Sequence, residues 1–154
     1  TGASNAQVQA LMQNPQYSLS ALTSLAVGLQ ELKGLPGRDA VVGFAAEAQT
    51  QDEVYFVTGA IAMLARHHQA VAPLSRVSAP GPILGHTADD GLTLPMPVDF
   101  VSWIEALATD VERTELQAPA KAAFVTGRAS ALARTNLASR GFKLTENVDL
   151  AAPR

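Results

Sequence analysis

The segment that most constrains the fold is residues 50–71, TQDEVYFVTGAIAMLARHHQAV. Between residues 54 and 65 every residue is apolar or small except Tyr55 and Thr58. A helix that is apolar on all sides is a buried one, and this stretch is shorter than the roughly 20 apolar residues that a membrane span needs. The sequence therefore predicts a central, buried helix of a soluble domain.

The ends of this segment also have the residues that a helix favours. Thr50 is placed to accept a hydrogen bond from the third amide of the helix, and Glu53 is placed to accept one from the amide of Thr50. Arg66, His67 and His68 lie at the other end, where the helix dipole stabilises positive charge. We expect the helix to begin at Thr50.

The charge composition and the cysteine count limit the classes of function that the chain can have. Charged residues make up only 16 % of the 154 residues, against roughly 25 % in an average soluble protein. The net charge of −3 and the scattered Lys and Arg residues argue against a nucleic-acid partner, because nucleic-acid-binding proteins show a basic patch. The chain has no cysteine, which excludes disulfides, cysteine-based zinc sites and cysteine nucleophiles.

The rest of the first half also favours helices. Apolar residues recur at helical spacing after Ser4, over residues 18–33 and over residues 39–48. Gly34 ends the second of these runs, and Asp39 is expected to cap the third. Short loops between the runs favour antiparallel packing. We predict a small bundle of about four helices in residues 1–72.

From Pro73 onward the pattern changes to strands and turns. A short strand is expected at residues 74–77, and two apolar runs at residues 83–87 and 92–96 flank Asp-Asp-Gly, a strong hairpin signal. Pro95 has no backbone N–H to donate, so we expect the second strand of this hairpin to lie at the edge of a sheet.

An amphipathic helix is expected next, with Asp99 as its N-cap. Its apolar stripe follows at spacings of i, i+3, i+4, i+7 and i+11 and consists of Phe100, Trp103, Ile104, Leu107 and Val111.

The last third predicts a strand, a helix and a strand. The strand is expected at residues 122–126, the helix at residues 131–140 with Ser130 as its cap and Gly141 after its end, and the second strand at residues 142–148. The fold class predicted for the chain is α+β, as a single domain of residues 1–154 with a helical half (1–72) and a mixed half (73–154).

Two segments of the chain resemble each other. FVTGAIAMLAR (residues 56–66) and FVTGRASALAR (residues 124–134) match at seven positions. A true repeat would make the second copy a helix and exclude the strand at residues 122–126. The alternative is coincidence in an alanine-rich chain, which we favour because true repeats usually preserve a whole supersecondary unit.

The residues with metal-ligand character are His67, His68, His86 and Asp90. Neighbouring histidines on a helix point about 100° apart, and the usual zinc pair at i and i+4 with a glutamate between does not occur. The alternative reading is that the histidines complement the helix dipole and that the aspartates serve the turn.

A ligand pocket is a second possibility. Tyr55, Phe100 and Trp103 are candidates to line one between the helical half and the hairpin, although such aromatic residues are more often part of the core. No nucleophile elbow and no pair of carboxylates spaced for glycoside hydrolysis occurs in the chain.

From these observations we expect a non-catalytic binding or scaffolding domain, without a cofactor, that binds a small ligand or a protein partner. The alternative is a metal-assisted, hydrolase-like enzyme that uses the His/Asp cluster, and self-association is a further alternative. The low charge and the absence of an initiator Met before Thr1 favour an exported bacterial-type protein, periplasmic or extracellular, or a domain of a longer chain.

Overall fold

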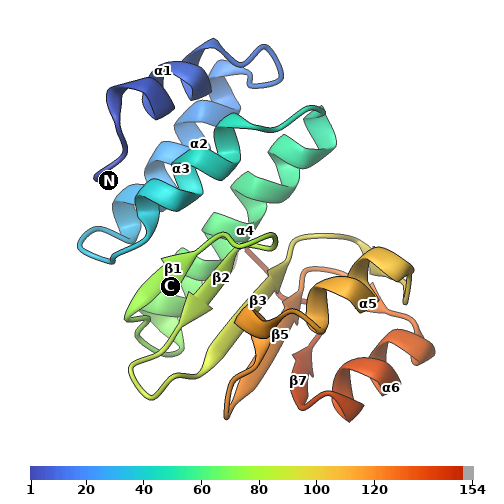
Figure 1. The fold of residues 1–154 in the computed structure, drawn as a ribbon. Coiled ribbons are helices and arrows are strands. Elements are labelled where there is room, and N and C mark those ends of the chain that lie inside the picture. The colour runs from blue at the N-terminus through green and yellow to red at the C-terminus, as the bar shows by residue number, and fades with distance from the viewer. Residues whose placement is uncertain (151–154) are drawn as a thin grey trace.

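A computed structural model describes residues 1–150 of the chain and has the expected α+β architecture, with a helical first half followed by strands and helices (Figure 1). The first half contains α1 (Asn5–Gln13), α2 (Leu19–Glu31), α3 (Arg38–Ala46) and α4 (Gln51–Ala70).

Side-chain caps start three of these helices, as serine and threonine do at the open N-terminal amides. Ser4, Ser18 and Thr50 accept from the amides of Gln7, Ala21 and Glu53. The cap at Thr50 is confirmed, but the carboxylate of Glu53 accepts from the amide of Gln49 (2.5 Å) and not from that of Thr50.

The cap predicted for α3 is wrong. Gly37 is its N-cap, with a φ of 89° and no side-chain cap, and Asp39 lies in the first turn of the helix. Glycine adopts this left-handed conformation without steric cost. A Cβ at Gly37 would also collide with the carbonyl of Val77. The backbone conformation and this close contact therefore both require glycine.

The helical half packs around α4. α2 contacts α4, and α1 contacts α3. α2 and α4 approach each other closely at Gly28, where an added Cβ would lie 2.6 Å from Cγ2 of Ile61. The fully buried side chains of this first core include Leu25, Leu32, Val41, Ile61 and Leu64.

The prediction of a buried α4 is confirmed for most of its length. Val54, Val57 and the residues from Ala60 to Ala65 other than Ala62 are buried. The helix is not covered on all sides, however, because Tyr55 is 66 % exposed.

A mixed sheet follows, with the strand order β1-β2-β3-β5-β7. β1 pairs with β2 and β2 with β3 in antiparallel fashion, whereas β3–β5 and β5–β7 are parallel. The strands of this sheet are β1 (Arg76–Ser78), β2 (Leu84–His86), β3 (Leu92–Met96), β5 (Lys121–Val125) and β7 (Phe142–Thr145). The first strand therefore begins two residues later than predicted.

The predicted hairpin is confirmed as β2–β3, but its second strand is not an edge. β3 is the middle strand of five. The amide of Leu92 donates to Ala120 and the carbonyl of Met96 accepts from Thr126, so these alternate residues direct their backbone groups toward β5. The nitrogen of Pro95 points to the opposite side, toward β2. The pairing of β3 with β2 ends at Thr93. Proline is tolerated here because no ladder bond is lost.

The helix predicted from Asp99 is wrong over its first part. Phe100–Val101 form β4, which pairs in parallel with β6 (Arg128–Ala129), and α5 covers only Glu105–Val111 with Ile104 as its N-cap. A short 3₁₀ helix follows at Thr114–Leu116. The partner strand lies far along the sequence, and such tertiary pairing overrides a local helical pattern.

The terminal strand–helix–strand unit is confirmed. α6 (Ala131–Ser139) joins the parallel strands β5 and β7, with Ser130 as the cap and Gly141 at a φ of 85°. The two similar segments take different structures: residues 56–66 lie within α4, whereas residues 124–134 run from a strand through a turn into a helix.

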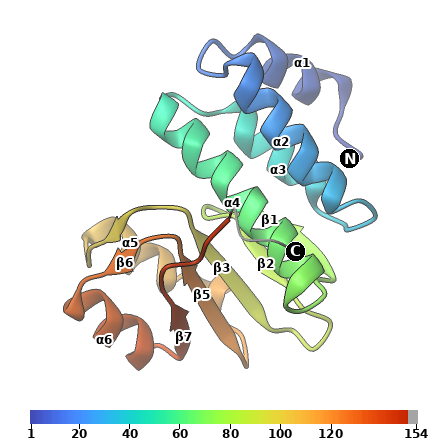
Figure 2. The same ribbon diagram turned by 180° about the vertical axis from the view of Figure 1, so that it is seen from behind.

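Helices lie on both faces of the sheet. In Figure 1 the α5 region lies in front of β5 and α6 lies beside β7, whereas α4 crosses β1 to β3 on the opposite face, as the reverse view in Figure 2 shows. A second core lies between the sheet and α5–α6 and includes Leu94, Val111, Leu116, Val125 and Leu137. None of the helices in residues 1–150 has both the length and the hydropathy of a membrane span.

Candidate functional site

A cavity of about 400 Å³ lies between the C-terminal half of α4, the sheet and the end of β7. We call it the α4–β7 cavity. Its apolar lining consists of Met63, Leu64, Val71, Pro95, Phe124 and Val148. Its polar lining includes Arg66, His67, Thr93 and Asn147.

The cavity follows from the way the sheet is covered. α6 contacts β7 on one face of the sheet. On the other face α4 contacts β3, but β5 and β7 lie further along the strand order. The chain after β7 crosses toward α4 (Figure 2) and closes one side of the space.

His67 provides the main polar group beside the sheet. Its ring lies 5.0 Å from the ring of Phe124, measured between centroids, and the two planes are tilted by 58°. Burial, with a smaller contribution from His68, lowers the pKa of His67 below its ordinary value of 6.5. The imidazole is therefore neutral at pH 7, with one nitrogen that donates and one that accepts.

The segment after β7 forms a wall that several hydrogen bonds hold in place. The amides of Asn147 and Val148 donate to the carbonyls of Gly127 and Val125 at 2.8 and 3.0 Å. Asn147 itself has a φ of 54°, a left-handed conformation that asparagine tolerates better than most residues.

Glu146 fixes the same segment from its other side. Its carboxylate accepts from the amide of Ala129 at 2.6 Å and forms two hydrogen bonds of 3.0 Å with the guanidinium of Arg134. These contacts, the bond to Arg134 first, lower the pKa of Glu146. The carboxylate is thus engaged by the protein, although it lines the cavity.

The structure does not bring the predicted metal ligands together. Nδ1 of His68 accepts from the amide of Leu74 at 2.8 Å, and Nε2 of His86 is hydrogen-bonded to Oγ of Ser78 at 2.8 Å. Asp90 occupies the β2–β3 turn with a φ of 62°. Within residues 1–150 no group of three or more His, Asp or Glu side chains is placed to hold a metal ion.

His86 is nevertheless an unusual residue, because it is one of the two buried polar side chains of the described part of the chain. Burial lowers its pKa, the charge of Arg76 lowers it further, and Asp90 opposes both. The residue is therefore a neutral hydrogen-bonding partner of Ser78 in the folded protein.

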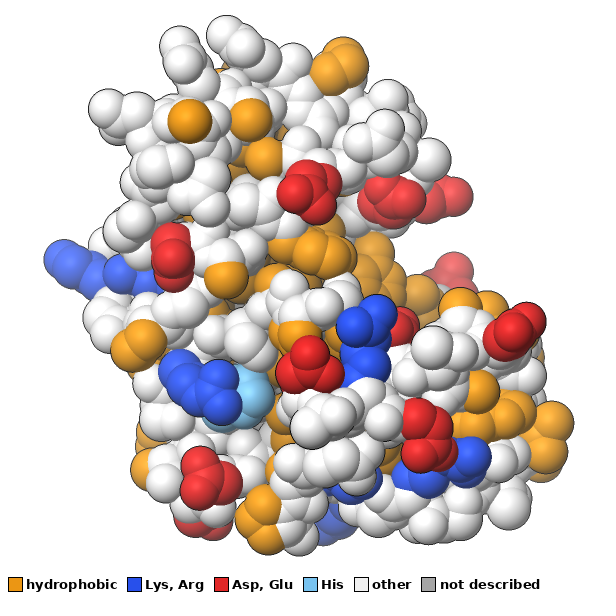
Figure 3. All heavy atoms as spheres, in the orientation of Figure 1, with side chains coloured by type: hydrophobic (Ala, Val, Ile, Leu, Met, Phe, Trp, Pro, Cys, Tyr) orange, Lys and Arg blue, Asp and Glu red, His pale blue; other side chains and the backbone are white. Residues whose placement is uncertain are grey.

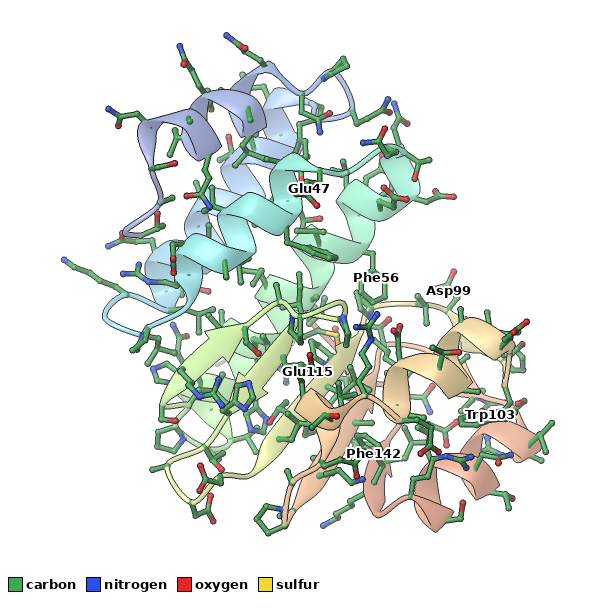
Figure 4. All side chains as sticks on the ribbon, viewed as in Figure 1. Glu47, Phe56, Asp99, Trp103, Glu115 and Phe142 are labelled. Carbon is green, nitrogen blue, oxygen red and sulfur yellow. The ribbon has the colours of Figure 1, made fainter. Side chains whose placement is uncertain are left out.

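The three predicted aromatic ligands lie in different surroundings. Tyr55 is exposed, and Phe100 lines a hollow next to α4. Trp103 packs against the second core beneath the guanidinium of Arg140, 4.8 Å from the ring centre (Figure 4). The three residues do not form one pocket.

Sequence reasoning did not single out Phe124, Asn147 or Val148 as lining residues. The sequence predicted a strand at residues 122–126, which includes Phe124. It did not indicate that the face of Phe124 would be covered by α4, because this depends on how the two halves pack.

A comparison of the chain with protein-family models, with curated proteins and with solved structures found no match. The function is therefore argued from the geometry of the site.

Proposed function

We propose that the chain is a non-catalytic binding domain that takes a small, mainly apolar ligand into the α4–β7 cavity. The observation that supports this most is the cavity itself, whose volume of about 400 Å³ falls within the range of roughly 300–1,000 Å³ usual for ligand pockets. Its lining also has the usual composition, with apolar walls and a few polar groups that converge on the space.

The polar groups indicate what the ligand would carry. A neutral His67 and the amide of Asn147 each offer a donor and an acceptor, and Arg66 on α4 adds a positive charge to a lining that also includes Glu146 and Asp149. An apolar ligand with one hydroxyl, carbonyl or carboxylate group matches this set. Phe124 would contact the apolar body of the ligand from the floor of the cavity.

Export of the protein remains part of this proposal. Its support is the low share of charged residues, 16 %. The alternative of a metal-assisted enzyme has no supporting observation, because His67, His68 and His86 each contact a different group.

A fluorescent probe of apolar sites, 1-anilinonaphthalene-8-sulfonate, tests the proposal. Val71 is 68 % exposed at the rim of the cavity, so Val71→Trp should obstruct the entrance without disturbing the core. We expect this variant to weaken dye binding by about tenfold or more. Val8→Trp, at an exposed position on α1 away from the cavity, is the matched control and should leave the affinity unchanged.

Nuclear magnetic resonance locates the bound dye. Amide shifts should change in residues 63–71 and 145–148. The proposal is wrong if the native chain does not bind the dye, or if Val71→Trp and Val8→Trp bind it as well as the native chain.

A further inference from the structure

Two hollows adjoin Phe56, near the N-terminal end of α4. One, of about 310 Å³, lies between α3 and α4, and the other, of about 240 Å³, lies between α4 and the segment of β4 and α5. Phe56 lines both, so the two hollows are neighbours on the surface. We call this surface the Phe56 groove and define it by Phe44, Phe56, Val57, Val98, Phe100 and Ile104.

Two of the large apolar side chains that define the groove are exposed to solvent. Phe100 and Ile104 are each 58 % exposed, although the helical pattern of the sequence predicted both to be buried. Figure 3 shows hydrophobic side chains within the hollow between the helical half and the lower lobe, at the right of the view. Contiguous exposed apolar residues on a folded domain mark an interaction surface.

Acidic residues predominate around the groove. The two segments that form its walls, residues 44–57 and 94–110, contain no Lys or Arg. They hold six of the 14 acidic residues of the chain, namely Glu47, Asp52, Glu53, Asp99, Glu105 and Asp110. Figure 4 shows Phe56 between Glu47 and Asp99, and Figure 3 shows the acidic side chains on both sides of the hollow.

Few of these carboxylates are neutralised within the chain. Among residues 1–150, Asp110 alone of the six forms an ion pair, at 2.9 Å to Arg113. Arg113 is also the basic side chain nearest the groove walls in sequence, and it donates to the carbonyl of Pro80 as well. The guanidinium of Arg113 is therefore already paired, and the carboxylates of the rim other than Asp110 can pair with a partner.

We propose that the Phe56 groove docks a basic, amphipathic segment of a partner protein. Apolar side chains of that segment would fill the two hollows beside Phe56, and its Lys or Arg side chains would meet the rim at Glu47 and Asp99. Charge complementarity selects this partner, because the same rim repels nucleic acid and anionic lipid. Amphipathic helices are commonly bound in apolar grooves in this way.

The test uses a synthetic 14-residue helical peptide with Leu at i, i+3, i+4 and i+7 and Lys elsewhere. A second peptide with Glu in place of every Lys is its matched control. Both are labelled with fluorescein, and fluorescence anisotropy is measured with the whole chain at 0.15 M salt. We expect the Lys peptide to bind and the Glu peptide to bind at least about tenfold more weakly.

Surface variants then locate the binding site. Phe100→Ser combined with Ile104→Ser removes exposed apolar contacts, and Glu47→Lys combined with Asp99→Lys reverses the rim. Each pair should weaken binding of the Lys peptide by about tenfold or more. The controls are Leu132→Ser, at an exposed position on α6 (59 %), and Asp39→Lys on α3. They should change the affinity by less than about twofold.

Three results would overturn the proposal. One is that neither peptide binds, and another is that the Glu peptide binds as well as the Lys peptide. The third is equal loss of affinity in the groove variants and their controls, which would indicate general attraction to an acidic protein.

Light scattering that shows self-association, abolished by Phe100→Ser with Ile104→Ser, would instead assign the groove to a second copy of the chain. Val71→Trp should not affect peptide binding, so this test stands apart from that of the α4–β7 cavity.

Discussion

At the scale of single residues, two histidines are held neutral by the fold. Burial is the main cause of the lowered pKa of both His67 and His86. His67 lies against Phe124, and His86 is hydrogen-bonded to Ser78. Among residues 1–150 neither imidazole has a carboxylate within ion-pair distance, and burial disfavours the charged form of both in the folded state.

This predicts the pH dependence of stability. The unfolded chain binds protons to these imidazoles near the ordinary pKa of 6.5, whereas the folded chain binds them only at lower pH. The free energy of unfolding should therefore be constant just above pH 6.5 and should fall as the pH is lowered from 6.5 toward the folded pKa values. Urea unfolding at pH 7.5, 6.5 and 5.5 measures it.

Histidine variants provide the control for this prediction. His86→Gln keeps a hydrogen-bonding side chain without the titration, so the loss of stability between pH 6.5 and 5.5 should be smaller in this variant. Stability that rises on acidification through this range would contradict the account.

The chemical character of the site residues could be predicted from the sequence only in part. His67 was singled out because of its type, and it does line the cavity, but as a neutral group beside an aromatic ring and not as a metal ligand. His86 and Asp90 lie on the same hairpin, whereas the position of His67 relative to them depends on the crossing of α4 over the sheet. No local pattern in the sequence encodes that crossing.

At the scale of secondary-structure elements, the β4–β6 pair shows how a glycine decides the local fold. Gly127 lies against the backbone of Asp99, where any Cβ would overlap the carbonyl group. The amides of Gly127, Arg128 and Ser130 donate to carbonyls of the β4 segment at 2.9 Å. The close approach of the two chains therefore needs a residue without a side chain at this position.

Gly127→Ala should separate β4 from β6. The added methyl group meets backbone atoms, which cannot move aside as a flexible side chain would, so we expect a loss of about 2 kcal/mol or more in the free energy of unfolding. Thermal unfolding followed by circular dichroism measures the change. Lys33→Ala is the control, because Lys33 also lies outside helices and strands and its side chain is exposed, so this variant should change the free energy of unfolding by less than about 0.5 kcal/mol. Equal stability of Gly127→Ala and the native chain would contradict the described pairing.

Elements with strong local signals could be predicted well. Ser4, Ser18 and Thr50 start helices, Asp-Asp-Gly turns a hairpin, and Gly141 ends α6. The helix predicted from Asp99 was wrong over its first part because its apolar spacing suits a helix, while Phe100 and Val101 pair with residues 28 positions further along the chain. The prediction that β3 is an edge strand was wrong for a related reason. Whether Pro95 removes a ladder hydrogen bond depends on the register of β3 with its neighbouring strands.

At the scale of the whole molecule, α4 connects the parts. It packs on α2 in the first core, crosses the sheet next to β3, and closes the α4–β7 cavity with its C-terminal half. Its N-terminal half provides Phe56 to the groove. Both proposed binding surfaces therefore depend on one helix that must remain fixed in place.

Hydrogen exchange of the backbone amides in α4 tests this account most directly. Amides deep in a packed element exchange only through larger opening events, whereas those of short surface helices exchange by local fraying. We predict that the amides of residues 61–65 exchange at least about a hundredfold more slowly than those of α1. Exchange of residues 61–65 at the same rate as α1 would contradict the central position of α4.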